Sequence, residues 1–367
     1  MPTPHRLRLL ISAAAALALS LTATAFAGTY DQTNLVSNVP GLAAHTDPNL
    51  VNPWGVSFSG TSPFWVSNQG TGTATLYDGA GNINALVVGI PGSATGPSGP
   101  TGQVFNPGSS FLLNGSASRF IFANLNGTIS AWNAGTTASV VATTPGAVYT
   151  GLAISGNNLY AANSSQGRVD VFNSSFALTS LGAGAFVDPT LPAGLVPFNV
   201  QSIGSTVYVT YASLGPGGAP MPGGVVDAFN PDGTFAQRIA TGGPLSAPWG
   251  IAIAPSGFGA FGGDFLIGNF GDGTIDAFSS TGSFLGALLG ANGLPLVNSG
   301  LWALEFRTGG ANVNTNALYI TAGINGEQGG LFAAITPTTP EPSSIILAGS
   351  GLIALAAGLR RRYLPAA

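Results

Sequence analysis

One short pattern recurs six times along the chain at intervals of 47 to 53 residues. Each copy begins with a turn that leads into a short apolar strand, as in Pro53-Trp54-Gly55-Val56 and Pro248-Trp249-Gly250-Ile251. The copies start near residues 52, 100, 149, 197, 247 and 300. Repeats of this length, built from short strands and turns, are typical of a β-propeller in which each repeat forms one blade.

The later part of each repeat has the same character. A second β-like run follows the first, as in Phe64-Trp65-Val66 and Phe265-Leu266-Ile267, and a Gly-containing turn then leads to a third strand. Six such repeats predict an all-β, six-bladed β-propeller that occupies residues 28–339 as one domain. A parallel β-helix is the alternative fold, but its repeat would be much shorter.

The two ends of the propeller are expected to meet in one blade. The last repeat offers three strands, near residues 301–306, 318–321 and 330–335, whereas Thr33-Asn34-Leu35-Val36 belongs to no repeat. Pairing that segment with the last repeat would complete its fourth strand and remove an exposed sheet edge.

The composition excludes several classes of site. The chain is 45% hydrophobic and 6% charged, and it contains no Cys and two His. A thiolate metal site and a cysteine nucleophile are therefore impossible, and a multi-His metal site is nearly excluded. Residues 28–339 carry four Arg against twelve acidic residues, which argues against nucleic-acid binding.

The first 27 residues resemble a secretory signal peptide. His5, Arg6 and Arg8 precede an uncharged run from Leu9 to Leu21, and Ala25-Phe26-Ala27 has the small-x-small pattern that signal peptidase reads. We expect cleavage after Ala27, with a transmembrane anchor as the alternative. Export through signal peptidase follows from this assignment.

Residues 340–367 form a second targeting segment. Pro340-Glu341-Pro342 is followed by an uncharged apolar run from Ile345 to Leu359, and then by Arg360, Arg361 and Arg362. The run is slightly short for a bilayer, and its arginines predict that this end stays on the cytoplasmic side. The order closely resembles the PEP-CTERM sorting signal. That resemblance implies an exosortase as partner, passage through the inner membrane of a Gram-negative bacterium, and delivery to the cell surface or extracellular matrix. An ordinary tail anchor is the alternative.

The sequence motifs within the repeats also resemble those of a known protein family. Asn52-Pro53-Trp54-Gly55, Ala247-Pro248-Trp249-Gly250 and Gly268-Asn269-Phe270-Gly271-Asp272-Gly273 are similar to motifs of an uncharacterised family of exported bacterial propellers. The resemblance to that family implies no particular activity for this chain. Propellers of the NHL and gluconolactonase type are more distant relatives in form, and a shared fold does not transfer their chemistry.

Four second strands end in Asn at one offset, namely Asn68, Asn124, Asn163 and Asn269. These side chains could bind a ligand, although Asn at such positions more often caps a turn. The loop around Asn269 and Asp272, with Asp276, also offers oxygen ligands for Ca²⁺, but it lacks the pattern of an EF-hand. We expect no cofactor, with calcium as the alternative.

Two further sets of residues could contribute to a site. Trp54, Trp249 and Trp302 could stack on sugars or fill the space between blades. One offset of the first strand reads Ser57, Val104, Ala153, Gln201, Ala252 and Glu305, which places two polar side chains in a mostly small or apolar ring. A buried Glu305 needs a partner or a shifted pKa.

These observations lead to three hypotheses about function, of which the third is a purely structural component of the matrix. The first is a non-catalytic surface or matrix module that binds exopolysaccharide or an envelope protein. The alternative is a hydrolase or lactonase that uses Glu305 and Asp272, with a Ca²⁺-dependent mechanism as one version. In either case we expect the ligand on the face where the first strands begin. The expected ligand-binding residues are Trp54, Asn68, Asn199, Gln201, Trp249, Asn269, Asp272 and Trp302.

Overall fold

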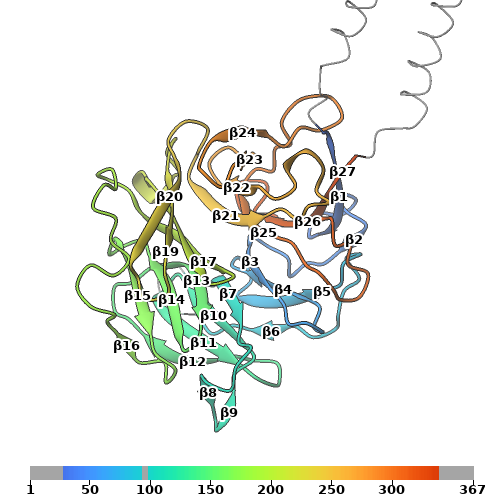
Figure 1. Ribbon diagram of the computed structural model, residues 1–367. Coiled ribbons are helices and arrows are strands. Elements are labelled where there is room, and N and C mark those ends of the chain that lie inside the picture. The colour runs from blue at the N-terminus through green and yellow to red at the C-terminus, as the bar shows by residue number, and fades with distance from the viewer. Residues whose placement is uncertain (1–27, 93–97, 339–367) are drawn as a thin grey trace, which may run out of the picture.

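The structure is a computed structural model that describes residues 28–92 and 98–338. Six sheets are arranged in chain order around a central axis, so the fold is a six-bladed β-propeller (Figure 1). The signal sequence with Ala25 and Ala27, and the sorting residues from Pro340 to Arg362, lie outside the described residues. Among the described residues, no helix is long and apolar enough to span a membrane.

The first three blades follow one another from the N-terminal side. Blade 1 contains β3 (Pro53–Ser57), β4 (Phe64–Asn68), β5 (Thr73–Tyr77) and β6 (Val88–Gly89). Blade 2 contains β7 (Pro100–Phe105), β10 (Phe120–Asn124), β11 (Thr128–Trp132) and β12 (Ser139–Thr143), with a small hairpin of β8 (Leu112–Leu113) and β9 (Ser116–Ala117) inserted. Blade 3 contains β13 (Tyr149–Ser155), β14 (Asn158–Asn163), β15 (Arg168–Phe172) and β16 (Leu178–Thr179).

The last three blades complete the ring. Blade 4 contains β17 (Val196–Ile203), β18 (Thr206–Ala212), β19 (Val225–Phe229) and β20 (Phe235–Thr241). Blade 5 contains β21 (Pro248–Ile253), β22 (Phe265–Asn269), β23 (Ile275–Phe278) and β24 (Phe284–Ala287). Blade 6 contains β25 (Leu301–Glu305), β26 (Leu318–Ala322), β27 (Leu331–Pro337), β1 (Tyr30–Ser37) and β2 (His45–Thr46). Each innermost strand begins within one residue of the predicted start of its repeat.

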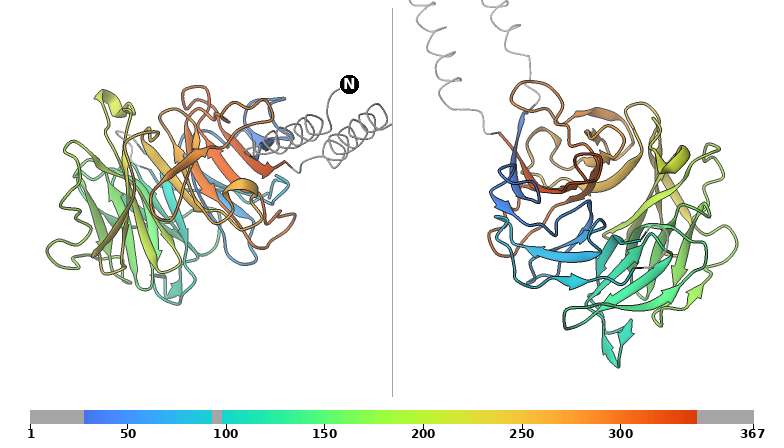
Figure 2. Two further views of the ribbon diagram at one scale, coloured as in Figure 1. Left: turned by 45° about the horizontal axis from the view of Figure 1, so that its top comes forward. Right: turned by 180° about the vertical axis from the view of Figure 1, so that it is seen from behind.

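The predicted closure of the ring is confirmed. β1 pairs antiparallel with β27 from Tyr30↔Pro337 to Ser37↔Leu331, so the N-terminal strand is the fourth strand of the last blade. Figure 2 shows β1 in blue beside β27 in red from two further directions. The bond from Thr338 N to Thr29 O, 2.8 Å long, extends this pairing beyond the strands.

The core lies between neighbouring blades. The inner strands are buried almost throughout, whereas outer strands such as β12 and β24 are largely exposed. Between blades 1 and 2, for example, the ring of Trp65 stacks on Phe120 with 4.1 Å between centroids. Because both faces of a blade are covered by its neighbours, the inner strands read as continuous apolar runs rather than alternating ones.

Candidate functional site

The strands of each blade run between the two faces of the ring, so successive turns of a blade lie on alternate faces. In blade 1 the start of β3 pairs with the end of β4, as Pro53↔Asn68 shows, and Asn68 also pairs with Thr73 at the start of β5. We call the face where the innermost strands begin the start face, and the face where they end the end face. The turns between second and third strands therefore lie on the start face.

A group of aromatic side chains closes the central channel near the start face. We call it the aromatic plug; its members are Trp54, Phe198, Trp249, Phe270 and Trp302. The rings of Trp54 and Trp302 stack with 3.5 Å between centroids, and Phe270 stacks on Trp302 at 4.1 Å. Trp249 of blade 5 reaches past blade 4 and donates from Nε1 to the carbonyl oxygen of Thr150 in blade 3, at 3.0 Å. The plug thus joins blades that are not neighbours in the ring.

The sequence explains why the plug fits there. At the position of the tryptophans, blades 2 and 3 carry the smaller Thr101 and Thr150, which leave room for indole rings from across the axis. The next position is Gly in four of the blades, and the innermost strands converge there. A Cβ on Gly102 would overlap the backbone nitrogen of Leu152 in the next blade. Small residues at this ring therefore let the strands approach closely enough for the plug to form.

Beyond the plug, the channel widens into a cavity of about 420 Å³ that is open at the end face. The whole ring identified in the sequence lines it, namely Ser57, Val104, Ala153, Gln201, Ala252 and Glu305. Half-buried Phe58, Phe105 and Phe306 line the open end, and Asn199 and Trp249 line the closed end. The size, and a lining that combines apolar side chains with a few polar ones, are those of a small-molecule site.

Gln103, Gln201 and Glu305 are the largest polar side chains that line this cavity. The amide of Gln103 is already engaged, because its Nε2 donates to the carbonyl oxygens of Gly55 and Trp65 at 2.8 Å each. Gln201 and Glu305 come from blades 4 and 6, and Gln201 Nε2 lies 3.5 Å from Glu305 Oε1 in the channel. The channel walls partly shield Glu305 from water, and this desolvation raises its pKa to about 8. Glu305 is therefore protonated at neutral pH, so the pair offers both donors and acceptors without a net charge.

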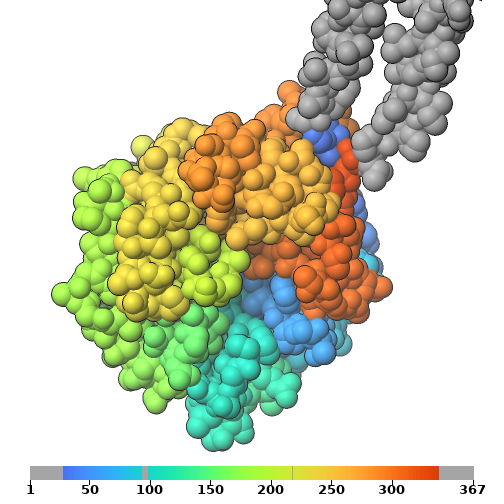
Figure 3. Space-filling view, viewed as in Figure 1, coloured from blue at the N-terminus to red at the C-terminus, as the bar shows by residue number. Residues whose placement is uncertain are grey.

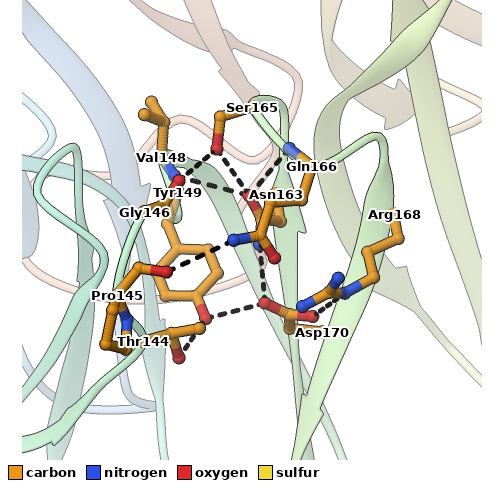
Figure 4. Close-up of polar contacts among 10 residues, drawn as sticks. All are labelled: Thr144, Pro145, Gly146, Val148, Tyr149, Asn163, Ser165, Gln166, Arg168 and Asp170. Atoms are coloured by element: carbon orange, nitrogen blue, oxygen red, sulfur yellow. Dashed lines mark hydrogen bonds and ion pairs between the residues drawn. The ribbon is translucent and has the colours of Figure 1, made fainter.

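The four Asn residues at the ends of the second strands are fully buried and have internal roles. Each donates from Nδ2 to a side chain on the third strand of its own blade: Asn68 to Thr75, Asn124 to Ser130, Asn163 to Asp170 and Asn269 to Asp276. Figure 4 shows Asn163 bonded to Asp170, which also accepts from Tyr149 and Arg168. These contacts fix strand two to strand three, so Asn68 and Asn269 lie away from the cavity.

The loop considered for calcium is a tight turn on the start face. The exposed Asp272 accepts at Oδ1 from the backbone and hydroxyl groups of Thr274, at 3.0 and 2.8 Å. Asp276 is buried against Asn269, and burial raises its pKa to about 6. Within residues 28–92 and 98–338, no three His, Asp or Glu side chains gather closely enough to hold a metal ion.

The structure separates the residues that the sequence grouped together. Asn199, Gln201, Trp249 and Glu305 line the cavity, whereas Trp54, Asn68, Asn269, Asp272 and Trp302 do not. Of the two roles considered for the tryptophans, the structure shows packing, because Trp54, Trp249 and Trp302 are at most 6% exposed and their rings pack on one another. The hollow lies at the end face instead. Glu305 and Asp272 lie on opposite faces, so they cannot act on one substrate as a pair.

One residue at the open end was not singled out in the sequence. Arg307 is 3% exposed, its guanidinium lies 4.7 Å from the Phe58 ring and 4.9 Å from the Phe64 ring, and it donates to the carbonyl oxygens of Ser59 and Ser62. It thus holds the loop of blade 1 that carries Phe58 against blade 6. A lone Arg two residues after Glu305, in a chain with so few cations, was the available signal.

Comparisons with known proteins agree with this architecture. Residues 338–362 match the model of the PEP-CTERM protein-sorting motif, which indicates export and exosortase processing in a Gram-negative bacterium. The soluble aldose sugar dehydrogenase of Escherichia coli has a similar structure, with a TM-score of 0.54, 14% identity, and coverage of 84% of this chain and 100% of that one. A Bacteroides thetaiotaomicron protein of unknown function gives a TM-score of 0.52 at 13% identity, covering 84% of this chain and 76% of that one. At these identities the likeness shows the fold alone.

Two relatives are close enough to define a family. Uncharacterized protein L690 of Acanthamoeba polyphaga mimivirus is 34% identical over 296 residues, which cover 75% of this chain and 78% of the relative. Uncharacterized protein R648 of the same virus is 33% identical over 328 residues, covering 84% and 80%. The chain is thus an exported six-bladed β-propeller with a PEP-CTERM sorting motif, and it belongs to the family that includes these two uncharacterised proteins.

Proposed function

We propose that this exported propeller is a non-catalytic binding module whose cavity takes a neutral, hydroxyl-rich unit of an exopolysaccharide. The observation that carries the proposal is the Gln201–Glu305 pair, whose polar groups meet in a cavity lined by both apolar and polar residues. Uncharged donors and acceptors beside apolar side chains suit a sugar, which has hydroxyl groups at its edge and C–H groups on its faces.

The open end supports the same ligand class. Phe58, Phe105 and Phe306 are half-buried there, and each presents an aromatic surface to the cavity. Phe58 and Phe306 are held in place by other side chains, since Arg307 lies over Phe58 and the ring of Phe306 packs edge-on against Phe258 at 4.9 Å. Aromatic surfaces that are already ordered lose little entropy when a ligand packs on them.

A hydrolase is the competing function. The raised pKa of Glu305 is compatible with it, because a protonated carboxyl group at neutral pH can act as a general acid. Hydrolysis of a glycosidic bond needs a second carboxylate about 5 to 10 Å away. Among the described residues that line the cavity, Glu305 is the one carboxylic acid. Binding therefore accounts for this lining better than catalysis.

The test is a glycan array followed by calorimetry on the glycan that binds. Glu305→Ala and Gln201→Ala should each weaken binding about tenfold, which corresponds to the loss of one hydrogen bond. Glu305→Gln should bind within about threefold of the wild type, because an amide has the shape and donor capacity of a protonated carboxyl group.

The conservative variant separates the two functions. A hydrolase would lose its turnover in Glu305→Gln, whereas a binding module keeps its affinity. Asp272→Asn on the start face is the matched control and should bind like the wild type. If Asp272→Asn weakens binding more than Glu305→Ala does, the cavity is not the site. If the array is blank and an envelope protein is bound instead, the sugar assignment is wrong. The proposal needs no cofactor, so EDTA should leave binding unchanged.

A further inference from the structure

Exposed apolar side chains gather on the outer edge of blade 5. Phe284 and Leu285 on β24 are 49% and 45% exposed, and Leu294 and Val297 in the following loop are each 62% exposed. The loop that follows β24 forms a small hairpin of its own, because Leu296 N donates to Leu288 O at 2.9 Å and Gly290 N donates to Leu294 O at 2.9 Å. We call these four residues the blade 5 rim. Figure 3 shows this orange segment at the edge of the molecule.

The blade 5 rim adjoins the place where the described chain begins and ends. Tyr30 N donates to Leu289 O at 2.8 Å, and the side chains of Gln32 and Asn298 exchange two hydrogen bonds of 2.9 Å. Thr29 in turn accepts from the backbone of Thr338. The loop of the blade 5 rim is therefore bonded to the N-terminal strand that pairs with the last residues before the sorting tail.

The tail leaves little slack between the propeller and a membrane. Six residues, 339–344, separate Thr338 from the uncharged apolar run Ile345 to Leu359. Even fully extended, six residues reach about 20 Å. When that run is in the bilayer, the surface of the propeller nearest Thr338 must lie at or close to the lipid.

We infer that the blade 5 rim rests on the outer surface of the inner membrane while the sorting tail holds the chain there. Contiguous exposed apolar side chains on a soluble domain mark interaction surfaces. Residues 279–300 carry no charged side chain, so the contact is apolar and does not depend on lipid charge. Four side chains suffice because the tether gives the propeller a high effective concentration at the membrane.

This seating fixes the orientation of the propeller. The rim is on the outer edge of a blade, whereas the cavity opens along the axis of the ring. The axis therefore lies roughly parallel to the membrane, and the end face remains open to solvent. The inference is independent of the proposed sugar binding, which concerns a different surface and is measured separately.

The absence of Cys from the whole chain allows a direct test with single labels. Leu294→Cys and Val297→Cys would carry a fluorophore in the full chain, held in nanodiscs of zwitterionic lipid that contains a lipid-borne quencher. The matched control is Leu178→Cys on the outer strand of blade 3, where Leu178 is 51% exposed. We expect quenching several-fold stronger at 294 and 297 than at 178, and unchanged when anionic lipid is added. Equal quenching at the three positions would overturn the inference.

Two further arms decide what covers the rim. Discs with a single copy of the protein should give the full effect; shielding that requires two copies per disc would mean that a second chain, not lipid, is the partner. In Leu294→Asp/Val297→Asp, a label placed by Leu285→Cys should lose its quenching while the melting temperature is unchanged, because both replaced side chains are exposed. If the label at position 285 is still quenched in the variant with both aspartates, the inference that the rim contacts lipid through apolar side chains is wrong.

Discussion

Glu305 lies in surroundings that oppose its ionisation. It is the one titratable side chain among the described residues that line the cavity, and its nearest polar neighbour is the neutral Gln201. Burial raises its pKa to about 8, whereas a free glutamate in the unfolded chain has a pKa of 4.5. The native state therefore holds a proton that the unfolded state releases between these two pH values.

This difference predicts a pH dependence of stability. Since the native state binds more protons between about pH 4.5 and pH 8, the free energy of unfolding must fall as the pH rises through this window. Because Glu305 is only partly shielded from water, we expect its share of the loss to be on the order of 1–2 kcal/mol. Denaturant unfolding of Glu305→Gln at pH 5 and pH 9 should show that this share is gone.

Ser57→Ala serves as the control, since it alters the same ring without removing a titratable group. Its profile should run parallel to that of the wild type. A Glu305→Gln profile that also runs parallel would show that Glu305 is ionised in the native state.

The shared offset in the repeats predicted which residues line the cavity, but it did not predict at which face the cavity opens. Ser57, Gln201 and Glu305 share an offset in the sequence, and the structure places all of them in one ring. Whether Trp54 and Trp302 stand at the mouth of the channel or fill it depends on contacts between blades 1 and 6, which become neighbours when the ring closes. Such contacts join residues about 250 positions apart, and no local periodicity reports them.

At the level of elements, β1 has a different role from the other outer strands. It is an outer strand like β6 or β16, yet it pairs with β27 over its whole length and joins the two ends of the chain. Tyr30 is buried between blades 5 and 6, and its ring stacks on Phe261. The sequence predicted this closing strand because a propeller with a three-stranded last blade leaves an unpaired edge. It did not predict the β8–β9 hairpin, which is an insertion outside the repeat.

Deleting residues 28–36 should strongly destabilise the protein. The deletion unpairs β27 and removes Tyr30 and Val36 from the core, so we expect a loss of at least about 3 kcal/mol in the free energy of unfolding. Thermal and denaturant melts of the deleted and intact chains measure it.

The β8–β9 hairpin offers a matched control of similar size. Phe111 and Ser118 at its base are already joined by a hydrogen bond of 2.9 Å, so residues 112–117 can be replaced by Asn-Gly without opening a blade. That variant should melt close to the wild type. If the two deletions cost the same, β1 does not close the ring.

On the scale of the whole molecule, all six blades lie within the described residues before Thr338. Every strand of these blades falls between Tyr30 and Pro337, ahead of the sorting tail in the chain. Removing residues 340–367 should therefore leave a folded propeller with an unchanged melting temperature, while its association with membranes is lost. Differential scanning calorimetry and flotation with lipid vesicles measure the two properties. A truncated chain that aggregates or melts early would place part of the propeller in the tail.

The aromatic plug has a consequence for any polymer that this protein meets. A channel open at both ends could thread a long chain through itself, but a channel sealed at one end admits only a terminus. The number of protein molecules bound would then depend on the number of chain ends in a polysaccharide and not on its length. A branched polymer would outcompete a linear one of equal mass, and breaking long chains into short ones would create new attachment points rather than destroy them.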